Sequence, residues 1–575
     1  MSKSMFLHLR PLALWALLLG LPAWTHAAPD AGALLQQLEA RPGGAFSAPA
    51  LKMPQEPTPP AAGEGGPTLR VNAWRIEGAG LLSEAQLQSA IAGFTGRDLS
   101  LTQLQEAAWV IVQAYRQAGW LAHAFVPPQE IDKGVVTVRV MEARLGEVRI
   151  EYPEGENVPR ALIREMADAQ LQRGQPLSLQ QVDRLLLLLD DLSGVVATAS
   201  YAPGHEAGST DVLLSLGSDK PLEGTVSLDN YGARSTGPNR VSANLTVHSP
   251  GGWGDTLQLQ AVSSDGSRYA RVAYLLPVGL EGWRAGVHAS DMRYHLVGSF
   301  SALQASGSAQ SWGADLSAPL IRQPEHNLSA QLTADRKRFD NLALANSNAT
   351  DATTVSHYTL DVLRAGLSGN WFDHANVAQN NASVQVTRGV VDLNNSPNAQ
   401  ADSLAANTAG YFYKLSANYN REQSLDGQTS WYVQVAAQWA NRNLDSSEKL
   451  YLGGPYGLRA YPNNEAAGSA GTTVTTGFKH RIDEAYTLNT FLDWGRINVY
   501  RNNWSSTGTE LATANAQYLQ GVGLTLSWRA PQGLELAGTL SHRQGNNPGA
   551  NTTTGADSDG TLTLNRFWLS ATMNF

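Results

Sequence analysis

Residues 221–575 consist of short segments in which apolar side chains alternate with polar or small ones. In the last segment every second residue is apolar, namely Phe567, Leu569, Ala571, Met573 and Phe575. A period of two places consecutive side chains on opposite faces of a β-strand. The mean hydropathy of −0.24 argues against several membrane-spanning helices, each of which needs about 20 apolar residues. The pattern therefore leaves a β-sandwich or a closed β-barrel.

The number of segments and the lengths of their connections favour the barrel. About sixteen alternating segments lie between residues 222 and 575, and membrane barrels have even strand numbers. Short connections such as 277–282 alternate with long polar ones such as 295–310 and 442–470. Short turns at one rim and long loops at the other are typical of outer-membrane barrels. We therefore predict a transmembrane β-barrel of about 16 antiparallel strands over 220–575, with a long loop at 442–470.

The N-terminus predicts export. Lys3 and Arg10 flank the start of the apolar stretch 12–23, which is followed by a small-residue pattern that ends at Ala27. This order is that of a secretory signal peptide, so we predict that residues 1–27 are removed. The apolar stretch is too short for a membrane anchor.

The sequence gives no support for catalysis or nucleic-acid binding. It contains no cysteine, and no G-x-S-x-G, H-E-x-x-H or phosphate-binding glycine loop occurs. The net charge is −9, whereas a nucleic-acid surface needs positive potential. We expect no enzymatic activity, no cofactor or metal, and no nucleic-acid partner.

Four further units precede the barrel. We expect residues 28–40 to form a short helix with Leu34, Leu35 and Leu38 on one face. Residues 41–67 contain seven prolines and five glycines, which predicts an extended linker. Residues 68–143 and 144–219 each predict the order β-α-α-β-β, and together they form an internal repeat.

Several segments carry a resemblance to a known family, the transporters of two-partner secretion (the TpsB family), which are relatives of the barrel-assembly insertases. Residues 125–140 resemble the end of that family's first POTRA domain, and Asp229-Asn230-Tyr231-Gly232 resembles its first barrel hairpin. The segment 452–461 resembles the arginine motif of the family's sixth loop, centred on Gly457, Leu458, Arg459, Ala460 and Tyr461. The segment 491–495 resembles the F-x-D-x-G strand motif, formed by Phe491, Asp493 and Gly495. The terminal Phe575 resembles the family's signal for barrel insertion.

The resemblance implies a fold and a function for the whole chain. The repeats would be two α/β POTRA domains in the periplasm, residues 28–40 a plug helix, and the long loops would lie at the cell surface. The protein would secrete one large exoprotein with an N-terminal secretion domain, without ATP. It would sit in outer-membrane lipid after insertion by the barrel-assembly machinery. An insertase for other barrels, a passive porin and an adhesin remain as alternatives.

Arg459 and Asp493 have two interpretations. On the strand 486–495, Asp493 shares its parity with Phe491 and would face the lumen, where a guanidinium is the best partner for a carboxylate. Alternatively, Arg459 is a solvated loop residue and Asp493 a water-facing pore residue. The resemblance implies an ion pair that holds the loop inside the barrel. The family commonly has Val and Gly beside this arginine, and Ala460 would be strained only if its φ were positive.

Overall fold

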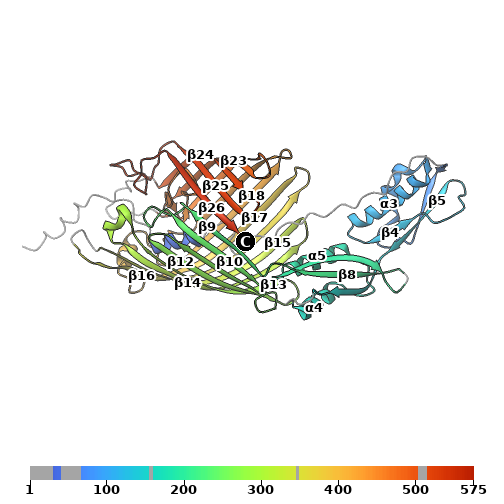
Figure 1. Cartoon of the computed structure of the whole chain (residues 1–575), viewed down its shortest axis with the longest axis horizontal. Coiled ribbons are helices and arrows are strands. Elements are labelled where there is room, and N and C mark those ends of the chain that lie inside the picture. The colour runs from blue at the N-terminus through green and yellow to red at the C-terminus, as the bar shows by residue number, and fades with distance from the viewer. Residues whose placement is uncertain (1–29, 40–66, 154–158, 207, 345–348, 503–514) are drawn as a thin grey trace, which may run out of the picture.

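The computed structural model describes residues 30–39, 67–153, 159–206, 208–344, 349–502 and 515–575. The predicted signal peptide and all but the last residue of the predicted linker lie outside these ranges. The described chain forms a barrel that contains a helix, and two small α/β domains in a row beyond one rim (Figure 1). Within the described ranges, no helix is both long enough and apolar enough to cross a membrane.

Sixteen antiparallel strands close into one barrel, as the alternating segments predict. The strands are β9 (Leu222–Asp229), β10 (Arg240–His248), β11 (Thr256–Ser263), β12 (Ser267–Val278), β13 (Trp283–His295), β14 (Ser306–Arg322), β15 (His326–Leu344), β16 (Ala352–Asp373), β17 (Ala378–Asp392), β18 (Gly410–Ser424), β19 (Thr429–Ala440), β22 (Ala470–Arg481), β23 (Tyr486–Asn498), β24 (Ala516–Arg529), β25 (Leu534–Gln544) and β26 (Asn565–Asn574). Each strand pairs with its sequence neighbour in the barrel, and β26 returns to β9. Closure satisfies the backbone groups that an open edge would leave unpaired in lipid.

The two faces of the barrel wall follow the alternation of the sequence. On β26, Phe567 and Leu569 are about half exposed, whereas the intervening Trp568 is buried. On β23, Leu492 is exposed while Phe491 and Asp493 are buried. Apolar side chains therefore cover the outside, as a lipid-facing barrel requires, and the side chains of the intervening residues point into the lumen.

Domain 1 (residues 67–143) is a three-stranded sheet covered by helices. Its elements are β1 (Thr68–Val71), β2 (Ala73–Glu77), α2 (Glu84–Ala90), η1 (Ala92–Phe94), β3 (Arg97–Ser100), α3 (Leu101–Gln117), β4 (Ala122–Phe125) and β5 (Val135–Glu142). Capping boxes at Ser83 and Ser100 begin α2 and α3. The sequence pattern missed the pairing of β1 with β3, because four-residue strands with one or two apolar residues are too short to show a period.

Domain 2 (residues 144–219) repeats this order without the extra strand pair. Its elements are β6 (Arg144–Glu151), α4 (Arg160–Gln170), α5 (Leu179–Asp190), β7 (Val195–Pro203) and β8 (Ser209–Ser218). The sheet order is β6-β8-β7, and Leu185, Leu188 and Leu189 of α5 are fully buried in its core.

Domain 2 is fixed to the turns of the barrel by ion pairs. The Arg322 guanidinium donates two hydrogen bonds of 2.9 Å to the carboxylate of Asp191, just after α5. The Arg322 side chain is 4% exposed. A second pair joins Arg184 of α5 to Glu281 at 3.1 Å. The buried pair therefore sets the orientation of domain 2 on the barrel rim.

We expect Asp191→Ala to loosen this connection, because it leaves a buried guanidinium without a counter-charge, at a cost of about 3–5 kcal/mol. Distances between spin labels on domain 2 and on β16, measured by pulsed electron paramagnetic resonance, should become broadly distributed. Glu281→Ala removes a half-exposed partner and should leave the distribution narrow. Equal broadening in both variants would contradict a dominant role for Asp191.

Candidate functional site in the barrel lumen

The long loop (residues 441–469) between β19 and β22 lies inside the barrel instead of extending from it. It contains η3 (Ser446–Glu448) and a short hairpin of β20 (Leu450–Tyr451) and β21 (Ala467–Gly468). An apolar cluster holds the loop against β23 and β24, and its members are Leu452, Leu458, Ala460, Tyr461, Ile497 and Leu519. All six are almost fully buried, so the loop is packed and not merely tethered at its ends.

Arg459 at the centre of this loop forms a bidentate ion pair with Asp493 of β23. Its Nη2 lies 2.6 Å from Oδ1 and its Nε 3.0 Å from Oδ2, and its backbone N–H donates to Oδ2 at 3.1 Å. The Thr475 hydroxyl donates to Oδ1 at 2.8 Å. The Asp493 side chain is 0% exposed, and the guanidinium carbon lies 3.3 Å from the Phe491 ring centroid. The structure thus brings together Arg459, Phe491 and Asp493, and we call the Arg459–Asp493 pair the loop latch.

The backbone beside the latch is also held by the strands that follow β23 in the barrel. The carbonyl of Arg459 accepts hydrogen bonds from the Ser541 hydroxyl at 2.7 Å and from Trp568 Nε1 at 2.8 Å. The Tyr461 hydroxyl donates to the carbonyl of Gln520 at 3.1 Å. The tip of the loop is therefore fixed by four consecutive strands, β23 to β26.

Two wall glycines allow this close approach. A Cβ on Gly495 would lie 3.1 Å from the terminal methyl carbons of Leu452 and Leu458, and one on Gly521 would lie 2.6 Å from the Cβ of Ala460. Ala460 is not among the residues with positive φ, so alanine is compatible with the backbone at this position. The departure from the family pattern at residue 460 therefore introduces no backbone strain.

The helix α1 (Ala31–Glu39) occupies the lumen beside the long loop. Leu34, Leu35 and Leu38 are at most 8% exposed and pack on apolar residues of the wall. Glu39 pairs with Lys337 at 3.1 Å, and the Ser446 hydroxyl donates to Asp30 at 2.8 Å. The helix therefore contacts both the wall and the loop, and the leucine face inferred from the sequence is its buried face.

A charged cluster that the sequence did not reveal links the loop to the wall. Glu448 of η3 pairs with Lys414 of β18 at 2.5 Å and with Arg364 of β16 at 2.6 Å. Arg364 also pairs with Asp335, whose other oxygen lies 2.8 Å from His288 Nε2. These residues are far apart in the sequence and share no local spacing, and the only sequence signal is the lumen-facing parity of the four that lie on strands.

Phe575 lies at the end of the closing strand and not in the lumen. Its N–H donates to the carbonyl of Gly224 at 3.0 Å and its carbonyl accepts from the Gly224 N–H at 3.0 Å. Its side chain is about half exposed on the lipid face. Its predicted role in insertion is therefore separate from the loop latch.

The arrangement holds two segments of the chain inside the barrel. No group of three or more His, Asp and Glu side chains within the described ranges is arranged to bind a metal ion. The lumen is filled by α1 and the long loop, which are held by ion pairs and apolar packing.

The chain is similar in sequence to a family of secretion proteins and to individual outer-membrane transporters. The model of the haemolysin secretion/activation protein family ShlB/FhaC/HecB matches residues 208–518, and that of the ShlB-type POTRA domain matches residues 69–143. The heme/hemopexin transporter protein HuxB of Haemophilus influenzae is 26% identical over 456 residues, which are 77% of each chain. The outer membrane transporter CdiB of Escherichia coli is 24% identical over 74% of this chain and 71% of its own length.

A solved structure shows the same fold. CdiB from Escherichia coli superposes with a TM-score of 0.63 at 18% sequence identity, covering 96% of this chain and 100% of that chain. The match includes the sixteen-stranded barrel and the N-terminal α/β region. Because the family model spans more than half of the sequence, the chain belongs to the haemolysin secretion/activation family ShlB/FhaC/HecB, the transporters of two-partner secretion systems.

Proposed function

We propose that this transporter captures one large exoprotein in the periplasm and passes it through the barrel after α1 and the long loop have left the lumen. The observation that carries this proposal is the closed barrel whose interior is occupied by two displaceable segments. A nine-residue helix is too short to be stable alone in water, so α1 depends on its lumen contacts. The predicted linker 41–67 spans about 80 Å when extended, which is enough for α1 to leave the barrel.

The arrangement of the chain supports an orientation in the outer membrane. Domain 2 docks on the short turns of the barrel, which would place both POTRA domains in the periplasm and the long loops at the cell surface. The outside of the barrel would contact outer-membrane lipid, and the barrel-assembly machinery would insert the chain by using Phe575. Folding of the exoprotein on the far side would prevent its return and replace ATP as the driving force.

Capture of the exoprotein would use a free sheet edge in domain 1. The strand β4 pairs with β5 on one side only and lies next to α3. An extended segment of the secretion domain could add to this edge by backbone hydrogen bonds. Leu101, at the start of α3, is 64% exposed and adds apolar surface to this domain.

The direct test is deletion of the protein in its own cell, followed by comparison of the culture supernatants. One large protein should disappear and return when the chain is restored. If the supernatant is unchanged while other barrels fail to assemble, the protein is an insertase and the proposal is wrong.

Removal of both POTRA domains (residues 68–219) should reduce secretion to background, because no periplasmic capture surface remains. Secreted protein is measured by immunoblot of the supernatant. Heat-dependent migration in gel electrophoresis provides the control that the shortened barrel is folded in the outer membrane. Normal secretion by a folded, shortened barrel would overturn capture by these domains.

A further inference from the structure

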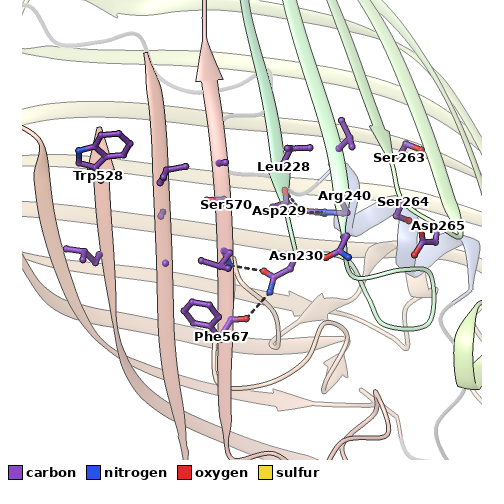
Figure 2. A pocket seen from close by; sticks show the side chains of 18 residues that line it. Leu228, Asp229, Asn230, Arg240, Ser263, Ser264, Asp265, Trp528, Phe567 and Ser570 are labelled. Carbon is purple, nitrogen blue, oxygen red and sulfur yellow. Dashed lines mark hydrogen bonds and ion pairs between the residues drawn. The ribbon is translucent and has the colours of Figure 1, made fainter. Parts of the chain in front are cut away.

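The barrel closes through a short seam between its first and last strands. The strands β9 and β26 share five residue pairs, from Ser570 with Asp229 to Asn574 with Thr225, and the Gly224–Phe575 backbone bonds continue the ladder at its lower end. By comparison, β9 and β10 share eight. The lipid-facing surface beside the seam is hollowed over about 1030 Å³, and its lining includes Leu228, Trp528, Phe567 and Leu569 (Figure 2). The seam is therefore shorter than its neighbour and uncovered on the outside.

Asn230 adds side-chain hydrogen bonds to the end of the seam, where its own N–H donates to the carbonyl of Leu569 at 3.2 Å. Its Oδ1 accepts from the Leu569 N–H at 2.8 Å, and its Nδ2 donates to the carbonyl of Phe567 at 3.0 Å (Figure 2). A carboxamide carries the same donor and acceptor as a peptide group. Asn230 thus acts as an additional side-chain link across the seam.

Tyr231 connects this end of the seam to the long loop. Its ring meets Trp568 of β26 and Tyr456 of the loop edge-on, with centroids 6.1 Å and 5.5 Å apart. Its carbonyl accepts from Asn463 Nδ2 at 2.8 Å. Trp568 in turn donates to the carbonyl of Arg459. Both strands of the seam therefore contact the loop segment that carries the latch.

We propose that Asn230 and Tyr231 are positioning residues that make closure of the β9–β26 seam depend on the loop being in place. When Arg459 leaves Asp493, Trp568 and Tyr231 lose their partners in the loop, and the seam keeps its ladder, the Asn230 bonds and the Tyr231 hydroxyl bond to Ser570 without support from the lumen side. Release of the latch then loosens the barrel wall as well as clearing the lumen. This inference rests on the displacement of the loop proposed above, but the seam can be measured without any secretion.

Hydrogen exchange of the purified full-length protein in liposomes tests the coupling. Asn230→Leu should speed exchange in the peptide 565–575 on the order of tenfold, because two hydrogen bonds across the seam are lost. Asn230→Asp keeps the acceptor for the Leu569 N–H, so its exchange rate in 565–575 should lie between those of Asn230→Leu and the unchanged protein. The matched control is Asn244→Leu on β10, where the amide bonds the Thr225 side chain, and it should leave this peptide unchanged.

The decisive variant is Arg459→Ala, which alters neither strand of the seam. It should speed exchange in 565–575 to a similar degree, while exchange in β17 stays constant. Adding Ser227→Cys and Thr572→Cys allows a disulfide across the seam, because these two hydroxyls lie 3.0 Å apart and the chain has no other cysteine. When this disulfide is formed by oxidation, exchange in 565–575 should return to the slow rate of the unchanged protein. Unchanged exchange in Arg459→Ala would overturn the coupling, and so would an effect that the disulfide does not reverse. Failure of secretion alone would affect the proposed function and not this inference.

Discussion

Replacing Asp493 with alanine is expected to open the channel, because Arg459 loses the carboxylate that fixes it and remains beside the Phe491 ring. Removing one partner of a buried ion pair costs about 3–5 kcal/mol. A penalty of this size raises the population of displaced loops by a factor of roughly 10² to 5 × 10³. Ion conductance of the purified protein in planar bilayers should therefore rise, with longer open periods.

The double variant shows whether the two residues act as a pair. Arg459→Ala combined with Asp493→Ala should have an effect on conductance and on secretion close to that of either single change, because one interaction is removed in each case. Asp361→Ala is a matched control, since Arg336 and Asp361 form a bidentate pair that is about half exposed. Such pairs contribute about 0–1 kcal/mol, so the control should leave conductance unchanged. Additive effects of the two lumen substitutions would show that Arg459 and Asp493 act independently.

The second large effect is expected from Leu35→Asp in α1. Leu35 is 0% exposed, and an unpaired carboxylate among apolar wall residues costs several kcal/mol. Because Leu35 lies at the centre of the apolar contacts that hold this nine-residue helix, the substitution should expel α1 from the lumen and raise conductance. A spin label on Gln36 should become mobile at the same time.

Leu35→Met keeps the apolar contacts and nearly the same volume, and it should leave both readouts unchanged. If Leu35→Asp raised conductance while the label on Gln36 stayed immobile, α1 would remain in the lumen and the opening would have another origin. Combining Leu35→Asp with Asp493→Ala separates the contributions of α1 and of the long loop to conductance, because the two segments block the lumen through different contacts.

The sequence allowed the barrel to be predicted because its pattern is local. Parity along β23 and β26 placed Asp493 in the lumen and Leu569 toward lipid without any knowledge of neighbouring strands. The partner of Asp493 could not be found in this way, because Arg459 lies in an irregular loop whose path depends on packing against β23 and β24. Physical reasoning left a solvated arginine as an equal alternative, and only the family resemblance favoured the pairing.

Other contacts carried no sequence signal. Glu448, Lys414 and Arg364 meet because three separate segments converge in the lumen, and single charged residues on such segments are ordinary in barrels. Asn230 looked like part of a hairpin motif, but its bonds to Phe567 and Leu569 join residues at opposite ends of the barrel sequence. Long-range closure of this kind depends on strand number and register, which residue patterns fix only approximately.

The docking of domain 2 supports one half of the barrel wall and leaves the other half without such contacts among the described residues. Its contacts are with His248, Glu281 and Arg322, which lie at the base of β10 to β14 and brace that half of the wall. The loop latch instead pulls on Asp493 and Trp568 in the unbraced half. Force from a polypeptide that pushes the loop aside would therefore act on β23 and β26 through the latch and on β16 and β18 through Glu448, while domain 2 supports β10 to β14.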